Sequence, residues 1–150
     1  MKKDNKGFSL VELLVVIAIM VVLVGVIAPS LLGNIEKSRE SRDIQTLDSI
    51  AAAVQQAIAD EKGYELGVGI TDAEISTLLN ETNAFNKLVK EYMGNVTAAP
   101  NLASQEARKG KIYVTVDSSA RVTVAVKTGT APSLTVVKAP KSNIDLSVTR

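Results

Sequence analysis

The feature that most constrains this chain is an uninterrupted apolar run near its N-terminus. The run Leu13–Ala28 contains no polar side chain, and Glu12 is the only charged residue of Phe8–Leu32. As an α-helix, Phe8–Leu32 would measure about 37 Å, which is enough to cross a hydrocarbon core of about 30 Å. The sequence therefore predicts a membrane-spanning helix at the start of the chain.

The residues that flank this run predict its orientation. Lys2, Lys3 and Lys6 precede it, against the single acidic residue Asp4. The positive-inside rule places such an N-terminus in the cytoplasm and the remainder of the chain outside. A secretory signal peptide fits less well, because no small-residue cleavage site follows the run and a cut after Ala28 would have to break an Ala–Pro bond.

Glu12 needs a physical reason within an apolar segment. A carboxylate in the bilayer costs about 2.5–3.5 kcal/mol near the centre of a helix, and less near the interface. A plain membrane anchor explains the length of the run but not this charge, and a shallow glutamate that reaches the headgroups is the structural alternative. Cleavage between Gly7 and Phe8 would create a cationic partner, the α-amino group of Phe8, and would remove the three lysines.

The segment Lys6–Glu12 (KGFSLVE), the apolar run behind it and Pro29 together resemble the class III leader of type IV pilins and pseudopilins. The resemblance covers roughly residues 2–32. It implies that a membrane prepilin peptidase cuts after Gly7 and N-methylates Phe8. It also implies that Glu12 is the assembly carboxylate and that Pro29 stands where the family typically has a proline.

Pro29 is expected to weaken the helix locally. Proline has no backbone N–H, and Gly25 and Gly33 lie on either side of it. These residues predict bending or local melting between Gly25 and Gly33 during extraction from the membrane, and an ordinary kinked transmembrane helix is the alternative interpretation.

A second, amphipathic helix pattern follows the apolar run. Apolar residues recur at spacings of three and four from Ile44 to Ile58, and no glycine or proline interrupts Asn34–Lys62. Gly63 is the predicted C-cap. The charge-rich stretch Glu36–Asp43 is predicted to be a solvated face, or alternatively a contact with a neighbouring subunit.

The connecting region is less regular. Thr71 and Glu74 have the spacing of a capping box before a short helix. A further short helix is predicted for Ala84–Met93, with Gly94 ending it. Asn95–Gly110 is predicted to be a loop.

The C-terminal part predicts a sheet. Lys111–Val116 and Arg121–Lys127 alternate apolar and polar residues and form a predicted hairpin. Leu134–Lys138 is a third predicted strand, and Asn143–Val148 is a fourth strand or a tail. The valine-rich face of this antiparallel meander needs a cover, which the apolar side of the long helix can supply.

The predicted fold class is therefore α+β, a pilin fold with a long N-terminal helix packed on a C-terminal antiparallel sheet. Residues 1–7 are the predicted leader, 8–32 the transmembrane and fibre-core half of the helix, and 33–150 the extracytoplasmic head. Within the head, 33–62 is the amphipathic helix, 63–110 the connecting αβ-loop region, and 111–150 the sheet.

Composition excludes several kinds of chemistry. The chain has no cysteine and no histidine, and its net charge is +1. This removes thiol nucleophiles, disulfides, ordinary zinc sites and histidine bases, and it gives no reason to expect nucleic-acid binding. Asp117 and Asp145 are the only side-chain carboxylates after Glu106, too few to predict the calcium site that type II secretion pseudopilins often have. We expect no cofactor, no metal and no enzymatic activity.

The leading hypothesis is a structural subunit of a type IV pilus-like filament. A pseudopilin of type II secretion or of DNA uptake is the alternative, and an unprocessed membrane-anchored binding domain is an alternative of another class. The resemblance implies as partners further copies of the chain, the prepilin peptidase, the pilus assembly platform and the cytoplasmic membrane. The expected location is a single pass through that membrane, and then a filament on the cell surface.

Overall fold

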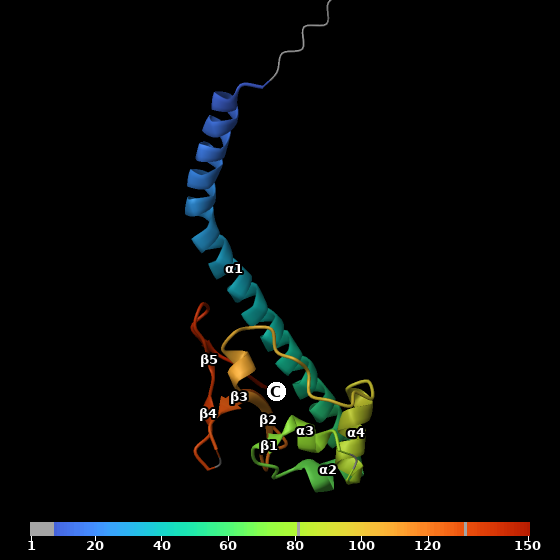
Figure 1. The fold of residues 1–150 in the computed structure, drawn as a ribbon. Helices are drawn as coiled ribbons and strands as arrows, with labels where there is room; N and C mark the ends of the chain where they lie inside the picture. The colour runs from blue at the N-terminus through green and yellow to red at the C-terminus, as the bar shows by residue number, and fades with distance from the viewer. Residues whose placement is uncertain (1–7, 81, 131) are drawn as a thin grey trace, which may run out of the picture. The chain divides into compact units, whose positions relative to one another are not determined.

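The computed structural model describes residues 8–80, 82–130 and 132–150 (Figure 1). The chain divides after Ile35 into two compact units, each described here by itself. Helix α1, Leu10–Ala59, begins in the first unit and ends in the second.

The first unit consists of the apolar part of α1. It belongs to a helix that is long and apolar enough to cross a membrane, and no residue in the most apolar stretch of that helix is buried. Residues 25–33 are α-helical throughout in the single chain, and bending or melting there during extraction from the membrane stays a prediction. A proline ring collides with the carbonyl four residues earlier, which here belongs to Gly25, and a glycine backbone readily accommodates the adjustment.

The amphipathic helix ends earlier than its pattern predicts. α1 stops at Ala59, and the Asp60 carboxylate accepts a hydrogen bond from Lys62 N at 3.0 Å to start α2, Glu61–Gly67. Gly63 is therefore inside α2 and is not a C-cap. A Cβ atom on Gly63 would lie 1.8 Å from Ala57 O, so this position is a glycine because the backbone of α1 passes so close to it.

The short helix predicted for residues 84–93 is confirmed as α4, Ala84–Tyr92. The Asn83 side chain caps it by accepting a hydrogen bond from Asn86 N at 2.8 Å. Gly94 follows with a φ of 80°, a conformation that favours glycine. α4 packs beside α2 (Figure 1). Gly67 of α2 leaves room for the ring of Phe85 in α4.

The predicted capping box of Thr71 and Glu74 is wrong. Glu74 is the N-cap of helix α3, Ile75–Leu78, and forms no side-chain capping bond there. Its carboxylate instead accepts from Ser76 Oγ and Lys111 Nζ. Residues 73 and 74 form the short strand β1, which the sequence analysis did not predict. The predicted loop 95–110 likewise contains a 3₁₀ turn, Ala107–Lys109.

The hairpin at the centre of the sheet is confirmed. β2 (Lys111–Val116) pairs antiparallel with β3 (Val122–Thr128), and Val114 lies opposite Val124. β1 (Ala73–Glu74) pairs with the free side of β2. The other side of β3 pairs with two short strands, β4 (Thr135–Val136) and β7 (Ser147–Thr149).

The third predicted strand is divided between two sheets, so the sheet is not a simple meander. Val137 donates to Val126 O and accepts from Leu146 N, both at 2.9 Å, and the chain changes its partner there. Beyond this residue, β5 (Lys138–Ala139) and β6 (Ile144–Asp145) form a separate two-stranded sheet.

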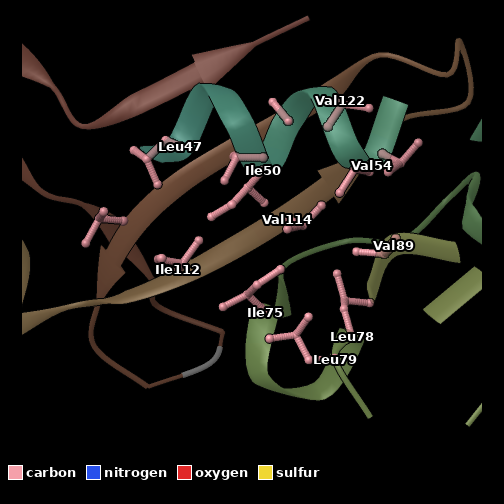
Figure 2. Close-up of a cluster of buried hydrophobic side chains, with 14 of the residues drawn as sticks. Leu47, Ile50, Val54, Ile75, Leu78, Leu79, Val89, Ile112, Val114 and Val122 are labelled. Carbon is pink, nitrogen blue, oxygen red and sulfur yellow. The ribbon is translucent and has the colours of Figure 1, made fainter. Parts of the chain in front are cut away.

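The core lies between α1 and the sheet. Figure 2 shows Leu47, Ile50 and Val54 of α1 directed toward β2 and β3, where Val114 and Val122 are labelled. All five side chains are fully buried. This α+β arrangement of a long N-terminal helix and an antiparallel sheet matches the pilin fold.

Candidate functional site

The start of α1 is built as a capping box. Ser9 Oγ accepts from Val11 N at 3.4 Å, and Glu12 Oε2 accepts from Ser9 N at 2.9 Å. These reciprocal bonds satisfy two backbone donors that would otherwise be unpaired at the helix terminus. Glu12 thus has a partner in its own chain, and the spacing Ser9-x-x-Glu12 was the sequence signal for it that we overlooked.

The predicted processing residues lie immediately before this box. Phe8 is not helical and is 85% exposed. Gly7 falls outside the described residues, so the cleavage site stays a prediction. If the chain is cut there, the new α-amino group of Phe8 will be one residue away from Ser9, whose backbone N–H donates a hydrogen bond to Glu12.

The stretch Leu13–Ala28 of α1 offers an exposed surface without polar side chains. The exposed side chains form a shallow groove along one face of the helix. It is lined by Leu14, Val15, Ala18, Ile19, Val22 and Leu23. The small Ala18 side chain lies among larger ones. Such a surface is stable only against lipid or against other apolar helices. Pro29 is part of the same exposed half.

The charged stretch 36–43 is only partly the solvated face that the sequence predicted: Lys37, Ser38, Arg39, Ser41 and Arg42 are exposed, but two of its carboxylates are not. Glu40 and Asp43 are each only 1% exposed. They are buried because distant loops cover them and donate hydrogen bonds to both carboxylates. No periodic pattern marks these partners, since they lie 60 or more residues away along the chain.

Ion pairs connect other parts of the head. Lys127 Nζ donates to Asp72 Oδ1, and this bond lowers the pKa of Asp72 despite partial burial. The pKa of Glu74 is lowered by its hydrogen bonds from Ser76 and Lys111. Two bonds from the Arg150 guanidinium, at 2.9 and 2.8 Å, hold the chain end to α1 and lower the pKa of Asp48.

Over residues 8–80, 82–130 and 132–150, no group of three or more histidine, cysteine, aspartate or glutamate side chains is placed to bind a metal. Asp117 is engaged in the β2–β3 turn, where its Oδ1 accepts from Ser119 N and Arg121 N.

Comparison with known proteins bears on the N-terminal segment. Residues 2–28 match the family model described as a prokaryotic N-terminal methylation motif. The chain carries a prepilin-type N-terminus. The match includes Gly7, Phe8 and the capping box, and it ends one residue before Pro29.

Curated relatives extend the similarity beyond this motif. Type II secretion system core protein G of Aeromonas hydrophila is 28% identical over 83 residues, 55% of each chain. Fimbrial protein Q of Moraxella bovis is 36% identical over 70 residues, 47% of this chain and 45% of the relative. The core protein G of Dickeya chrysanthemi is 31% identical over 72 residues, 46% and 47% of the two chains.

The chain therefore spans about half the length of the curated relatives it matches. No solved structure gives a significant match. Together, the motif and these relatives identify the chain as similar to type IV pilins and pseudopilins.

Proposed function

We propose that this chain is a structural subunit that polymerises through residues 8–32 into a type IV pilus-like filament. In this proposal a prepilin peptidase first cuts between Gly7 and Phe8 and N-methylates Phe8. The observation that carries the proposal is an exposed apolar helix half that directly follows a prepilin-type N-terminus. The role is structural and needs no catalytic site.

Leaving the membrane creates the physical demand for assembly. An extracted subunit exposes the apolar half of α1, and water cannot accommodate that surface. Packing against the same helix of other subunits replaces the lipid. The groove around Ala18 provides one place where a neighbouring side chain can approach the backbone closely.

Glu12 then fixes the position of one subunit against the next. Its carboxylate can pair with the Phe8 ammonium of a neighbour, and an unpaired charge is strongly penalised in a low-dielectric core. The hydrogen bond from Ser9 N does not prevent this, because an ionised carboxylate has about four acceptor positions. The capping box holds Glu12 in a fixed position at the start of α1, where a neighbour's Phe8 ammonium would have to reach it.

The remaining parts of the proposal follow from this role. Residues 1–7 are the leader, residues 8–32 the transmembrane and later fibre-core segment, and residues 33–150 the extracytoplasmic head. The partners are further copies of the chain, the prepilin peptidase, the assembly platform and the cytoplasmic membrane. The subunit first crosses that membrane once, with its N-terminus in the cytoplasm, and then joins a surface filament.

A pseudopilin of a secretion pseudopilus is the second candidate. Similarity to type II secretion system core protein G from two organisms favours it, whereas similarity to fimbrial protein Q favours a pilus. Both candidates use the same N-terminal chemistry. They differ in whether the filament extends from the cell surface.

Mass spectrometry of the N-terminal peptide tests the proposal. Material sheared from cells and the membrane fraction are digested separately. N-methylated Phe8 in sheared filaments is the result we expect. The same peptide found only in membranes would favour the pseudopilin, and an intact leader in both fractions would leave the membrane-anchored binding domain.

A further inference from the structure

Two buried carboxylates of α1 make the same set of contacts with two different loops. Glu40 Oε1 accepts from Lys141 N at 3.0 Å, and its Oε2 accepts from Ser142 N at 2.9 Å and from Ser142 Oγ at 2.6 Å. Two successive backbone amides and one serine hydroxyl thus converge on one carboxylate. We refer to Glu40, Lys141 and Ser142 as the Glu40 latch.

The second set repeats this arrangement less than one helical turn later. Asp43 Oδ1 accepts from Ala103 N at 2.6 Å, and its Oδ2 accepts from Ser104 N at 2.8 Å and from Ser104 Oγ. Asp43, Ala103 and Ser104 form the Asp43 latch. Glu36, on the preceding turn, extends the row by accepting from Gln105 N at 2.6 Å.

Hydrogen-bond donors alone compensate these two buried charges. Among the described residues neither Glu40 nor Asp43 belongs to an ion pair. An ionised carboxylate only accepts hydrogen bonds, and each one here meets three donors. A buried charge without such donors is strongly penalised. Each carboxylate is therefore stable in its buried position only while its loop lies against α1 and donates these hydrogen bonds.

The latches join segments that are far apart in the chain. The Glu40 bonds close separations of 101 and 102 residues, and the Asp43 bonds close separations of 60 and 61. The chain contains no cysteine, so a disulfide cannot hold either loop. The two latches share no donor, and their loops belong to different parts of the sequence.

We propose that Glu40 and Asp43 are two separate devices that close the head onto α1. Glu40 holds the segment of β5 and β6, residues 138–145, and Asp43 holds the loop of residues 99–105. Each loop opens locally when its own carboxylate is replaced by an uncharged amide, while the other loop stays closed and the core between α1 and the sheet stays intact. The latches act in the single chain and do not depend on filament assembly.

Amide hydrogen exchange of the full chain in detergent micelles tests this directly, because the donated N–H groups are themselves the probes. Glu40→Gln keeps the shape of the side chain but replaces one acceptor by an NH₂ group. We expect exchange at Lys141 and Ser142 to accelerate about tenfold or more, since bonds to a charged group are the strong ones. Exchange at Ala103 and Ser104 should stay within about twofold of the original chain.

Asp43→Asn should give the reverse pattern, with fast exchange at Ala103 and Ser104 only. Glu65→Gln is the matched control, because Glu65 is an exposed carboxylate of the same head. Ser142→Ala and Ser104→Ala remove one hydroxyl each and should accelerate the same segment by a smaller factor.

The serine variants decide the question if a charge variant unfolds the whole head. Acceleration of both loops together in every variant would overturn the proposal, because the head would then open as one unit. Unchanged exchange in both loops would show that the carboxylates do not hold them.

Discussion

Replacing Glu12 in two ways separates its charge from its role in the capping box. Glu12→Gln keeps an oxygen that can accept from Ser9 N, because capping boxes use either glutamate or glutamine. It removes the negative charge that would pair with a neighbouring Phe8 ammonium. Glu12→Val removes both the charge and the cap. We expect both variants to insert into the membrane at least as well as the original chain, since each lacks the carboxylate.

The expected losses differ in size. A hydrogen bond to a charged group contributes about 1.5–3 kcal/mol, which corresponds to about a 10- to 150-fold weaker addition of each subunit. Loss of the cap costs about 0.5–2 kcal/mol and affects only the first turn of α1. The filament yield of Glu12→Gln should therefore fall at least about tenfold, and that of Glu12→Val should fall at least as far.

The assay compares the amount of chain in sheared filaments with the amount in membranes, for equal expression. Glu65→Gln, which changes an exposed carboxylate of the head, should retain the original yield. A normal number of filaments in Glu12→Gln would refute the charge pairing. If only Glu12→Val lost its filaments, the function of Glu12 would be the cap.

Three further changes have defined outcomes. Gly67→Ala would place a Cβ atom 2.6 Å from the buried ring of Phe85. The resulting overpacking costs about 1–3 kcal/mol, which should outweigh the gain of about 1 kcal/mol in helix propensity. The urea midpoint of unfolding in detergent should therefore fall. Gly33→Ala, whose Cβ atom would meet nothing within 4 Å, should not lower it, and equal midpoints for both variants would contradict the packing argument. The hydrogen bond from Lys127 lowers the folded-state pKa of Asp72, so the stability that this bond contributes is present above the ordinary pKa near 3.8 and is lost as the pH falls below it. Asp72→Asn should therefore narrow the difference between the urea midpoints at pH 7 and pH 3. An unchanged difference would disprove this contribution. Gly7→Val should leave the N-terminal peptide uncut in mass spectra, and a normally processed N-terminus would contradict the proposed cleavage site.

Local patterns predicted several elements correctly, because their signals and their partners lie close together in the chain. Alternating valines and a short turn specify the β2–β3 hairpin. α4 is likewise bounded by local signals: Asn83 caps its start, and Gly94 lies just after its last residue. The capping box of Ser9 and Glu12 is a local signal of the same kind, because its two residues lie within one helical turn.

At Gly63 and Glu74, contacts that form only on folding override the local signal. Gly63 resembles a helix C-cap, yet it is required where the turn after Ala59 brings α2 against the backbone of α1. Glu74 resembles part of a capping box, yet its backbone pairs with β2 in the sheet and Lys111 donates a hydrogen bond to its carboxylate. Lys111 lies 37 residues from Glu74, so no local pattern shows that contact.

By itself, the sequence determined that the chain has a membrane-length apolar helix with a prepilin-type start, because hydrophobicity and a short motif depend only on neighbouring residues. It also determined that an apolar helix face and a valine-rich sheet face must cover each other. Only the tertiary structure decided that Glu40 and Asp43 are buried. A charged side chain is stable inside a protein only where donors meet it, and these donors come from loops that folding brings back to α1 from 60 or more residues away.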